Sequence, residues 1–295
     1  MKLNKNTNLQ KYLALLKTVE YKSFTKAAAE LKCSQSGISR MIGDLEHEWG
    51  VNLLARSRAG VYLTAEGQKL LPYVRAVYQQ CERLQTQVDE LNGLQSGLIR
   101  IGTFSSVATH WLPNIIREFQ KNYPNIEYEF LLGDYDEIEN WILDGRVDCG
   151  FLRLPVSQEL ETLLLARDKH LVIMPEGHPL ANCERFPLAA LADYPFMLQQ
   201  SGECSDVTEI LAQHKIRPKV HLSTWDDYVI MSMVENGLGI SILPQLILER
   251  VPYRLVCKDL EVPAWRDIVF CVHSREQAPL AVKKFMEYLD FRESI

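Results

Sequence analysis

The chain lacks any long apolar run and any export signal. Hydrophobic residues make up 47% of its 295 residues, yet no stretch of them reaches the roughly 18 residues that a membrane-spanning helix needs. The opening residues, MKLNKNTNLQK, are cationic and lack the apolar segment that a signal peptide carries. We therefore expect a cytoplasmic protein with no membrane partner.

Paired cysteines and the common catalytic motifs are also missing. The seven cysteines include no C-x-x-C pair, so we expect reduced thiols and no structural metal site. The sequence contains no G-x-S-x-G, no H-E-x-x-H, no phosphate-binding loop and no dinucleotide-binding fingerprint. We therefore expect no enzyme activity and no cofactor.

Positive charge is scarce overall and is concentrated at one end of the chain. The formal net charge is −6 at pH 7. Residues 1–63 hold ten Lys or Arg against five Asp or Glu, whereas the remainder holds 22 against 33. A basic head on an acidic body is typical of a protein that binds phosphate at one end.

The basic end contains the pattern of two short helices around a tight turn, between Ser23 and Leu45. Each predicted helix has an apolar face with the i, i+3, i+4, i+7 spacing of a 3.6-residue period. The apolar residues are Phe24, Ala27, Ala28 and Leu31, then Ile38, Met41, Ile42 and Leu45. Ser34 can cap the second helix. A helix over residues 9–19 completes a three-helix core.

The polar face of the second helix predicts DNA recognition. It carries Gln35, Ser36, Ser39 and Arg40. In the major groove an amide can bridge two atoms of adenine and a guanidinium two atoms of guanine. Two short β segments follow, 53–56 and 61–63, and predict a wing with cations at its tip. The expected phosphate contacts are Lys32, Arg56 and Arg58.

A long helix follows the wing, and Thr64 is its predicted cap. Its apolar residues alternate at spacings of four and three, which is typical of a coiled coil. They are Leu70, Val74, Val77, Cys81, Leu84, Val88 and Leu91. We expect this face to pair two chains. The alternative is an amphipathic helix that packs on its own domain.

From Leu98 onward, strands alternate with helices, which predicts a largely parallel sheet. A first set of elements covers residues 98–152, and a second set begins with a strand over 171–174. The segments 268–272 and 279–291 are expected to return to the first set. We therefore divide the chain into a DNA-binding domain (1–63), a dimerisation helix (64–93) and a two-lobed α/β domain (94–295). Lobe 1 covers about 98–164 and 267–295, and lobe 2 covers about 165–266.

These residues resemble LysR-type transcriptional regulators over essentially the whole chain. The amino-terminal signature is Ala27-Ala28-x-x-Leu31, Ser34-Gln35-Ser36-x-Ile38-Ser39, Gly50-Val51-x-Leu53-Leu54 and Leu63-Thr64-x-x-Gly67. The resemblance implies a winged helix-turn-helix followed by a periplasmic-binding-protein-like effector domain. It implies sequence-specific binding to double-stranded promoter DNA, control by a small-molecule effector, and a homodimer or homotetramer, with RNA polymerase as a further partner.

A ligand is expected beyond the carboxyl ends of the strands, where open α/β sheets bind ligands. The hydroxyl, amide and aromatic groups there, with one Arg, would suit a small carboxylate. The candidates are Thr103, Ser105, Ser106, Phe151, Arg153, Gln200, Ser201, Thr224 and Trp225. The alternative for each Ser or Thr is ordinary helix capping.

Cys204 supports a different form of control. It lies near the position at which peroxide-sensing members of the family keep their reactive thiol, but no second cysteine follows nearby. A small thiol that lines the ligand pocket is the interpretation we adopt. A redox-sensing regulator and a constitutive architectural DNA-binding factor remain the alternatives.

Overall fold

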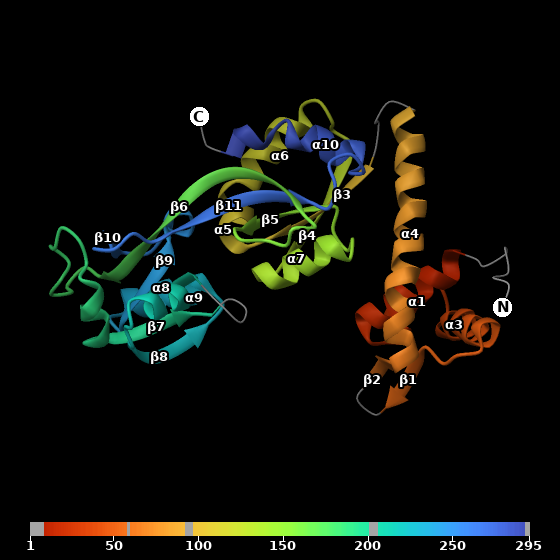
Figure 1. Ribbon diagram of the computed structural model, residues 1–295, viewed down its shortest axis with the longest axis horizontal. Coiled ribbons are helices and arrows are strands. Elements are labelled where there is room, and N and C mark those ends of the chain that lie inside the picture. Colours follow the sequence, from red (N-terminus) through yellow and green to blue (C-terminus); the bar gives the residue numbers. More distant parts are fainter. Residues whose placement is uncertain (1–8, 58–59, 92–96, 201–205, 293–295) are drawn as a thin grey trace. The chain divides into compact units, whose positions relative to one another are not determined.

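The computed structural model describes residues 9–57, 60–91, 97–200 and 206–292, and Figure 1 draws the whole chain. The chain divides into two compact units, residues 1–88 and 89–295. No helix in the described part of the chain is long and apolar enough to cross a membrane.

The first unit is a three-helix bundle with a β-hairpin wing. Its elements are α1 (Leu9–Tyr21), α2 (Phe24–Glu30), α3 (Gln35–Trp49), β1 (Leu54–Ser57) and β2 (Gly60–Leu63). Ser34 caps α3, because its Oγ accepts a hydrogen bond of 3.0 Å from the Gly37 N–H. Leu15, Ile38 and Leu45 are fully buried between the helices. The predicted winged helix-turn-helix is confirmed.

The long helix α4 (Ala65–Leu91) begins against the wing. Thr64 holds this start, because its hydroxyl donates to the Asn52 carbonyl at 2.6 Å and accepts from the Gly67 N–H at 2.9 Å. A Cβ on Gly67 would lie 2.2 Å from the Leu53 carbonyl oxygen. Only glycine therefore allows the helix to begin so close to the wing.

The second unit is an α/β structure in two lobes. Lobe 1 contains β3 (Gly97–Thr103), α5 (Ser105–His110), α6 (Leu112–Gln120), β4 (Ile126–Leu132), α7 (Tyr135–Leu143), β5 (Cys149–Arg153), α10 (Leu280–Met286) and the 3₁₀ segment η3 (Leu289–Arg292). Lobe 2 contains η1 (Leu188–Ala192), β7 (Pro195–Gln199), α8 (Asp206–Gln213), β8 (Lys219–Thr224), α9 (Asp227–Glu235), β9 (Ile240–Pro244), η2 (Gln245–Leu248) and β10 (Leu255–Asp259). The predicted two-lobed fold is confirmed.

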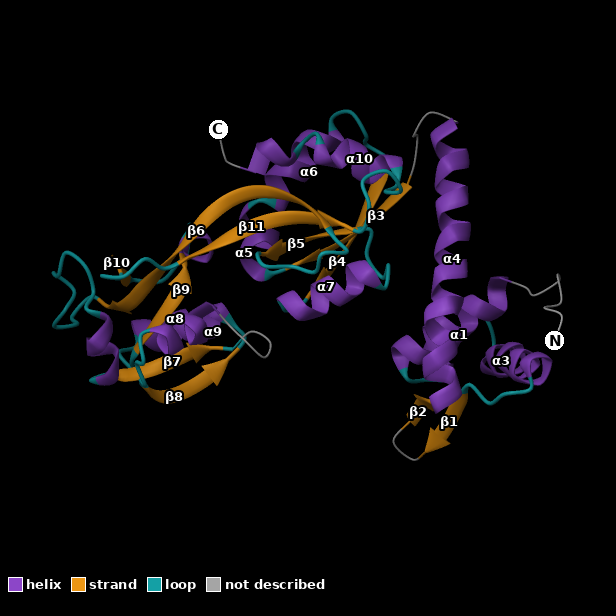
Figure 2. Cartoon of the chain, viewed as in Figure 1, coloured by secondary structure: helices purple, strands orange, loops and turns teal. Residues whose placement is uncertain are grey.

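Two long strands, β6 (Glu161–Pro175) and β11 (Trp265–Val272), run between the lobes, as Figure 2 shows. The strand order is β4-β3-β5-β11-β6-β9-β7-β8, with β10 also on β6. Pairs within each lobe, such as β3–β4 and β7–β8, are parallel, but both crossing strands pair antiparallel with their neighbours. The prediction of a largely parallel sheet therefore holds inside the lobes and is wrong at the crossing.

The first half of β6 was not predicted as a strand. Its charged run Arg167-Asp168-Lys169 is typical of a surface loop in a single sequence. In the fold these charges face partners on other strands: Arg167 binds Asp267 of β11, and Lys169 binds Asp259 of β10. Cross-strand ion pairing therefore compensates for the polar sequence.

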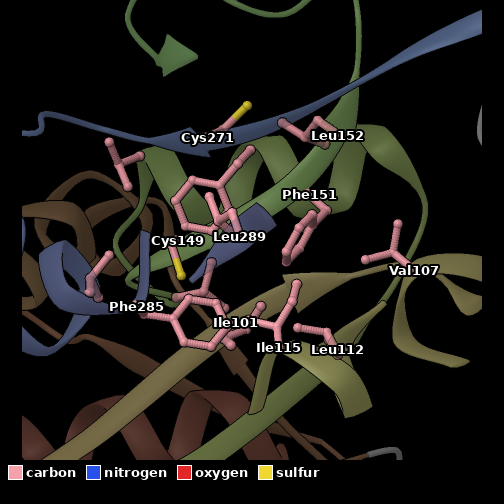
Figure 3. Packing of buried hydrophobic residues seen from close by; sticks show 14 of the residues in the cluster. Ile101, Val107, Leu112, Ile115, Cys149, Phe151, Leu152, Cys271, Phe285 and Leu289 are labelled. Carbon is pink, nitrogen blue, oxygen red and sulfur yellow. The ribbon is translucent and has the colours of Figure 1, made fainter. Parts of the chain in front are cut away.

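Each lobe has its own hydrophobic core. Figure 3 shows the core of lobe 1, in which Phe151, Phe285, Ile101 and Leu289 pack together. Lobe 2 has one cluster around Phe196 and another around Met197, which are successive residues of β7. Since successive strand residues point to opposite faces, the sheet of lobe 2 is covered on both sides.

Candidate functional site

The exposed face of α3 carries the polar residues expected to read DNA. Gln35, Ser36 and Arg40 are exposed and Ser39 is half-buried, whereas Ile38 and Ile42 on the opposite face are buried. Arg40 has no ion-pair partner within the described ranges. Its guanidinium is therefore available to a base or a phosphate.

The residues predicted to bind phosphate flank this face. Lys32 is exposed in the turn before α3, with a φ of 51°. Arg56 lies on β1, although its side chain is not described. Arg58 lies outside the described residues.

The predicted dimerisation face of α4 divides into two parts. Val74 is buried and Leu70 is half-buried against the helix-turn-helix core, as the alternative interpretation expects. Farther along the helix, Val77 is 48% exposed, Leu84 66% and Val88 43%. Cys81 between them is half-buried. The side chain of Leu91 is not described. The carboxyl-terminal half of this face is thus apolar and open in the single chain.

A cavity of about 500 Å³ lies between the two lobes of the second unit. Four of the residues predicted to bind an effector line it: Ser105 and Ser106 at the start of α5, Gln200 after β7, and Trp225 before α9. The carboxyl ends of β3 and β7 thus meet at one crevice. Ser201 and Cys204 lie outside the described residues.

Four other predicted residues do not line this cavity. Thr103 is fully buried at the end of β3. Phe151 is also fully buried, and its ring centroid lies 5.3 Å from that of Phe270. The Thr224 hydroxyl accepts from the Asp226 N–H at 3.2 Å, which is a local turn contact. Arg153 is engaged in ion pairs. The sequence pattern placed these residues near strand ends but could not show which way each side chain points.

Arg266 on β11 is the central charged group of the crevice, and no motif in the sequence pointed to it. Its Nε and Nη2 donate to Asp168 Oδ2 at 2.9 and 2.7 Å. Nη1 donates to the Tyr135 hydroxyl at 2.7 Å, and Nη2 also donates to Ser106 Oγ at 2.9 Å. The guanidinium lies 4.9 Å from the Phe104 ring centroid. Burial alone would lower the pKa of Arg266, but Tyr135 and Asp168 hold it above its usual value.

A second ion-pair cluster joins the lobes beside the cavity. Arg153 of lobe 1 binds two carboxylates of α8 in lobe 2, Asp206 at 3.0 Å and Glu209 at 2.9 Å. His170 Nε2 lies 3.5 Å from the other oxygen of Asp206. Burial pushes the pKa of Asp206 up, but the hydrogen bond from His170 and the charge of Arg153 hold it below its usual value. Arg153 therefore links lobe 1 to lobe 2 through these two ion pairs.

Asp227, the first residue of α9, is a buried carboxylate on the cavity wall. The residue is only 7% exposed. Gln199 is hydrogen-bonded to it, yet Oδ1 has no hydrogen-bond partner in the part of the chain that the structure describes. Burial raises the pKa of Asp227 from 3.8 to about 6.

A further cavity, of about 620 Å³, lies beside α5 and β6. Several cations line it, and three of them already have hydrogen-bond or ion-pair partners. Arg167 binds Asp267 at 2.7 and 2.9 Å, and Lys169 lies 3.3 Å from Asp259. Arg292 donates to the Leu165 carbonyl at 2.7 Å. The crevice between the lobes is the stronger candidate because four of the residues predicted to bind an effector line it, and none of them lines this further cavity.

Two family models together match nearly the whole described chain. The model described as "Bacterial regulatory helix-turn-helix protein, lysR family" matches residues 9–68, and "LysR substrate binding domain" matches residues 92–292. Among curated proteins, the uncharacterized HTH-type transcriptional regulator YvbU of Bacillus subtilis is 30% identical over 92% of this chain and 94% of its own length. The probable HTH-type transcriptional regulator LrrA of Synechococcus elongatus is 35% identical over 88% and 89%.

Solved structures share the fold. A full-length OxyR variant from Pseudomonas aeruginosa has a TM-score of 0.75 at 18% identity and covers 97% of this chain and 95% of its own. CbnR, solved in complex with its target DNA, has a TM-score of 0.69 at 20% identity, over 97% of this chain and all of its own.

Proposed function

We propose how this chain, which belongs to the LysR family of DNA-binding transcriptional regulators, is controlled. A small-molecule effector binds in the crevice between the lobes and changes how paired chains hold promoter DNA. The observation that carries this proposal is the cavity of about 500 Å³, with the buried Arg266 on its wall. Relatives of this chain are regulators and not enzymes, so a bound molecule acts here as a signal.

At the DNA end, α3 enters the major groove and Gln35, Ser36, Ser39 and Arg40 contact bases. Their common face and the absence of competing ion pairs at Arg40 among the described residues support this role. Lys32, Arg56 and Arg58 bind phosphates beside it. RNA polymerase is the partner through which the bound regulator acts.

Arg40→Ala should cost about 1–3 kcal/mol of specific DNA binding if Arg40 pairs with a guanine. The measurement is the dissociation constant of the full chain for a genomic fragment that the wild-type protein selects. Random DNA of the same length is the control, and its affinity should change far less. An equal loss on both DNAs would make Arg40 a phosphate contact.

The open half of the α4 face pairs two chains. Val77, Leu84 and Val88 are large apolar residues at coiled-coil spacing and are exposed in one chain, and burying them against a second copy would stabilise a dimer. Two paired recognition helices would then read a pseudo-palindromic site. Contacts between effector domains would extend the dimer to a tetramer.

Leu84→Glu should convert the protein to a smaller species in solution and weaken binding to the selected fragment at least tenfold. The reason is that a charge at the centre of this apolar face would be desolvated on pairing. Analytical ultracentrifugation gives the mass. Ala76→Glu adds the same charge at an exposed position off this face and should leave the mass unchanged. An unaltered Leu84→Glu mass would place the interface elsewhere.

The effector of this proposal carries a carboxylate. Ser106 and Tyr135 hydroxyls and the Gln200 side chain offer polar contacts at the crevice, and Arg266 supplies a buried positive charge. Four hydrogen bonds occupy the Arg266 guanidinium among the described residues, and a guanidinium has five N–H groups. One N–H group is thus left for a ligand.

A further inference from the structure

Asp227, which lines the crevice, has a buried carboxylate oxygen that lacks a donor among the described residues. Asp227 is 7% exposed, and its Oδ1 has no hydrogen-bond partner among the described residues. Leaving a buried acceptor unsatisfied costs free energy, and more so when the group is charged. Arg266, Gln199 and the N-terminal end of α9 favour the charged carboxylate at this position, but Oδ1 still lacks a donor in the part of the chain that the structure describes. A ligand with an N–H or O–H donor would satisfy it.

The charges on the cavity wall also favour a cation. Three carboxylates line the cavity, those of Asp134, Glu137 and Asp227, and Arg266 is the lining cation. Asp168 already matches Arg266 at 2.7 Å. Asp134 and Glu137 each accept a hydrogen bond from the other's backbone N–H as the capping box of α7, and neither has an ion-pair partner among the described residues. A ligand that is only an anion would add to this excess.

An open aromatic ring lies on the same wall. Trp225 is 74% exposed and lines the cavity two residues before Asp227. The Phe104 ring, by contrast, is already beside the Arg266 guanidinium. A protonated amine is attracted to an aromatic face, and to Trp most strongly. The open ring and the unsatisfied carboxylate oxygen thus favour the same kind of group.

We propose that the effector carries a protonated amine beside its carboxylate, with Asp227 and Trp225 as the ammonium site. The carboxylate lies toward Ser106 and Arg266, and the ammonium donates to Asp227 Oδ1. Amino acids and their close derivatives have this chemistry. The inference rests on the proposed function, in which an effector occupies this crevice.

The test compares matched compounds on the full chain. Each protein amino acid is paired with the 2-hydroxy acid that has the same side chain, and the melting temperature is measured at saturating concentrations of each. At one hundred times the dissociation constant, the bound amino acid should raise the melting temperature by roughly 5–10 °C. Its hydroxy acid should bind at least tenfold more weakly.

Two variants locate the ammonium. Asp227→Asn keeps the shape but removes the charge, and should abolish the shift while the variant remains folded. Asp136→Asn removes a carboxylate from α7, where Asp136 is exposed and outside the cavity lining, and should keep the shift.

The outcomes separate the two proposals. If a hydroxy acid shifts the wild-type protein as strongly as its amino acid, or if Asp227→Asn responds normally, the ammonium site is wrong and the crevice remains an effector site. If no compound of either series shifts the wild-type protein, the carboxylate-bearing effector is wrong as well.

Discussion

Replacing Arg266 with Met should cost about 3–5 kcal/mol of the free energy of unfolding, because it leaves the Asp168 carboxylate buried without its charge partner. Both side chains are nearly inaccessible, at 4% and 7% exposure. Asp168 Oδ1 accepts from the Leu246 N–H at 3.0 Å, but a single backbone donor does not replace a guanidinium that donates twice. Methionine retains much of the volume, so the loss would come from the charge.

Denaturant unfolding of the purified variants measures this effect. The double variant Arg266→Met with Asp168→Asn should recover much of the loss, because it removes the buried Asp168 charge together with its partner. Arg167 provides a matched control on the same pair of strands. It binds Asp267 with two hydrogen bonds, but its side chain is 58% exposed, and Arg167→Met should change stability little. Equal effects at the two positions would contradict the role assigned to burial.

Arg266→Met should also weaken effector binding in the crevice. Its guanidinium joins β11 to β6 through Asp168, to α7 through Tyr135 and to α5 through Ser106. Without it, the start of α5 and the start of α7 lose a common anchor. The variant is therefore expected to bind the effector poorly even under conditions in which it is folded.

Asp227→Asn should stabilise the unliganded protein at pH 8, by roughly 3 kcal/mol at most. The pKa of Asp227 in the folded chain is raised to about 6 from 3.8, chiefly by burial, with the nearby Asp226 charge adding to it and Arg266 and the Gln199 hydrogen bond opposing it. The folded state thus binds the proton more tightly than the unfolded state. The stability that protonation contributes is complete below about pH 4 and is lost as pH rises through 6.

Thermal or denaturant unfolding from pH 4 to pH 8 checks this sign. The wild-type protein should gain less from Asp227→Asn at pH 4 than at pH 8, because the carboxyl is then protonated and resembles the amide. Asp226→Asn is an instructive contrast: the Asp226 carboxylate accepts from the Tyr228 and Val229 N–H groups as the cap of α9, so its loss should destabilise the protein. A destabilising Asp227→Asn at pH 8 would show that the carboxylate is structural.

A residue that weakens the empty protein and serves a ligand is a known compromise at functional sites. In Asp227 the compromise is visible in one atom, since Oδ1 is buried without a donor in the described chain. The stability measurement tests whether the Asp227 carboxylate destabilises the unliganded protein. The ligand measurement tests whether the same carboxylate binds the effector.

The sequence by itself determined the DNA-binding end. The faces of α2 and α3 and the cap at Ser34 all follow from spacings within a few residues, and a helix converts such spacings directly into surfaces. The same local logic identified Gln35 and Arg40 as exposed and Ile38 as buried. On α4 it predicted the apolar face, but not that Val74 would be buried on its own domain while Leu84 stays open.

Only the tertiary structure decided the crevice. Arg266 and Asp168 are 98 residues apart in the chain, and Arg266 and Ser106 are 160 apart. Spacing within a segment carries no information about such pairs, because they form when β6 and β11 cross between the lobes. Loop sequences predicted that Ser106 and Trp225 would face a ligand. They made the same prediction for Phe151 and Thr103, which are buried in the core because side chains alternate between the two faces of a strand. The burial of Asp227 Oδ1 without a donor in the described part of the chain arises in the same way, since burial is a property of everything that packs around a residue.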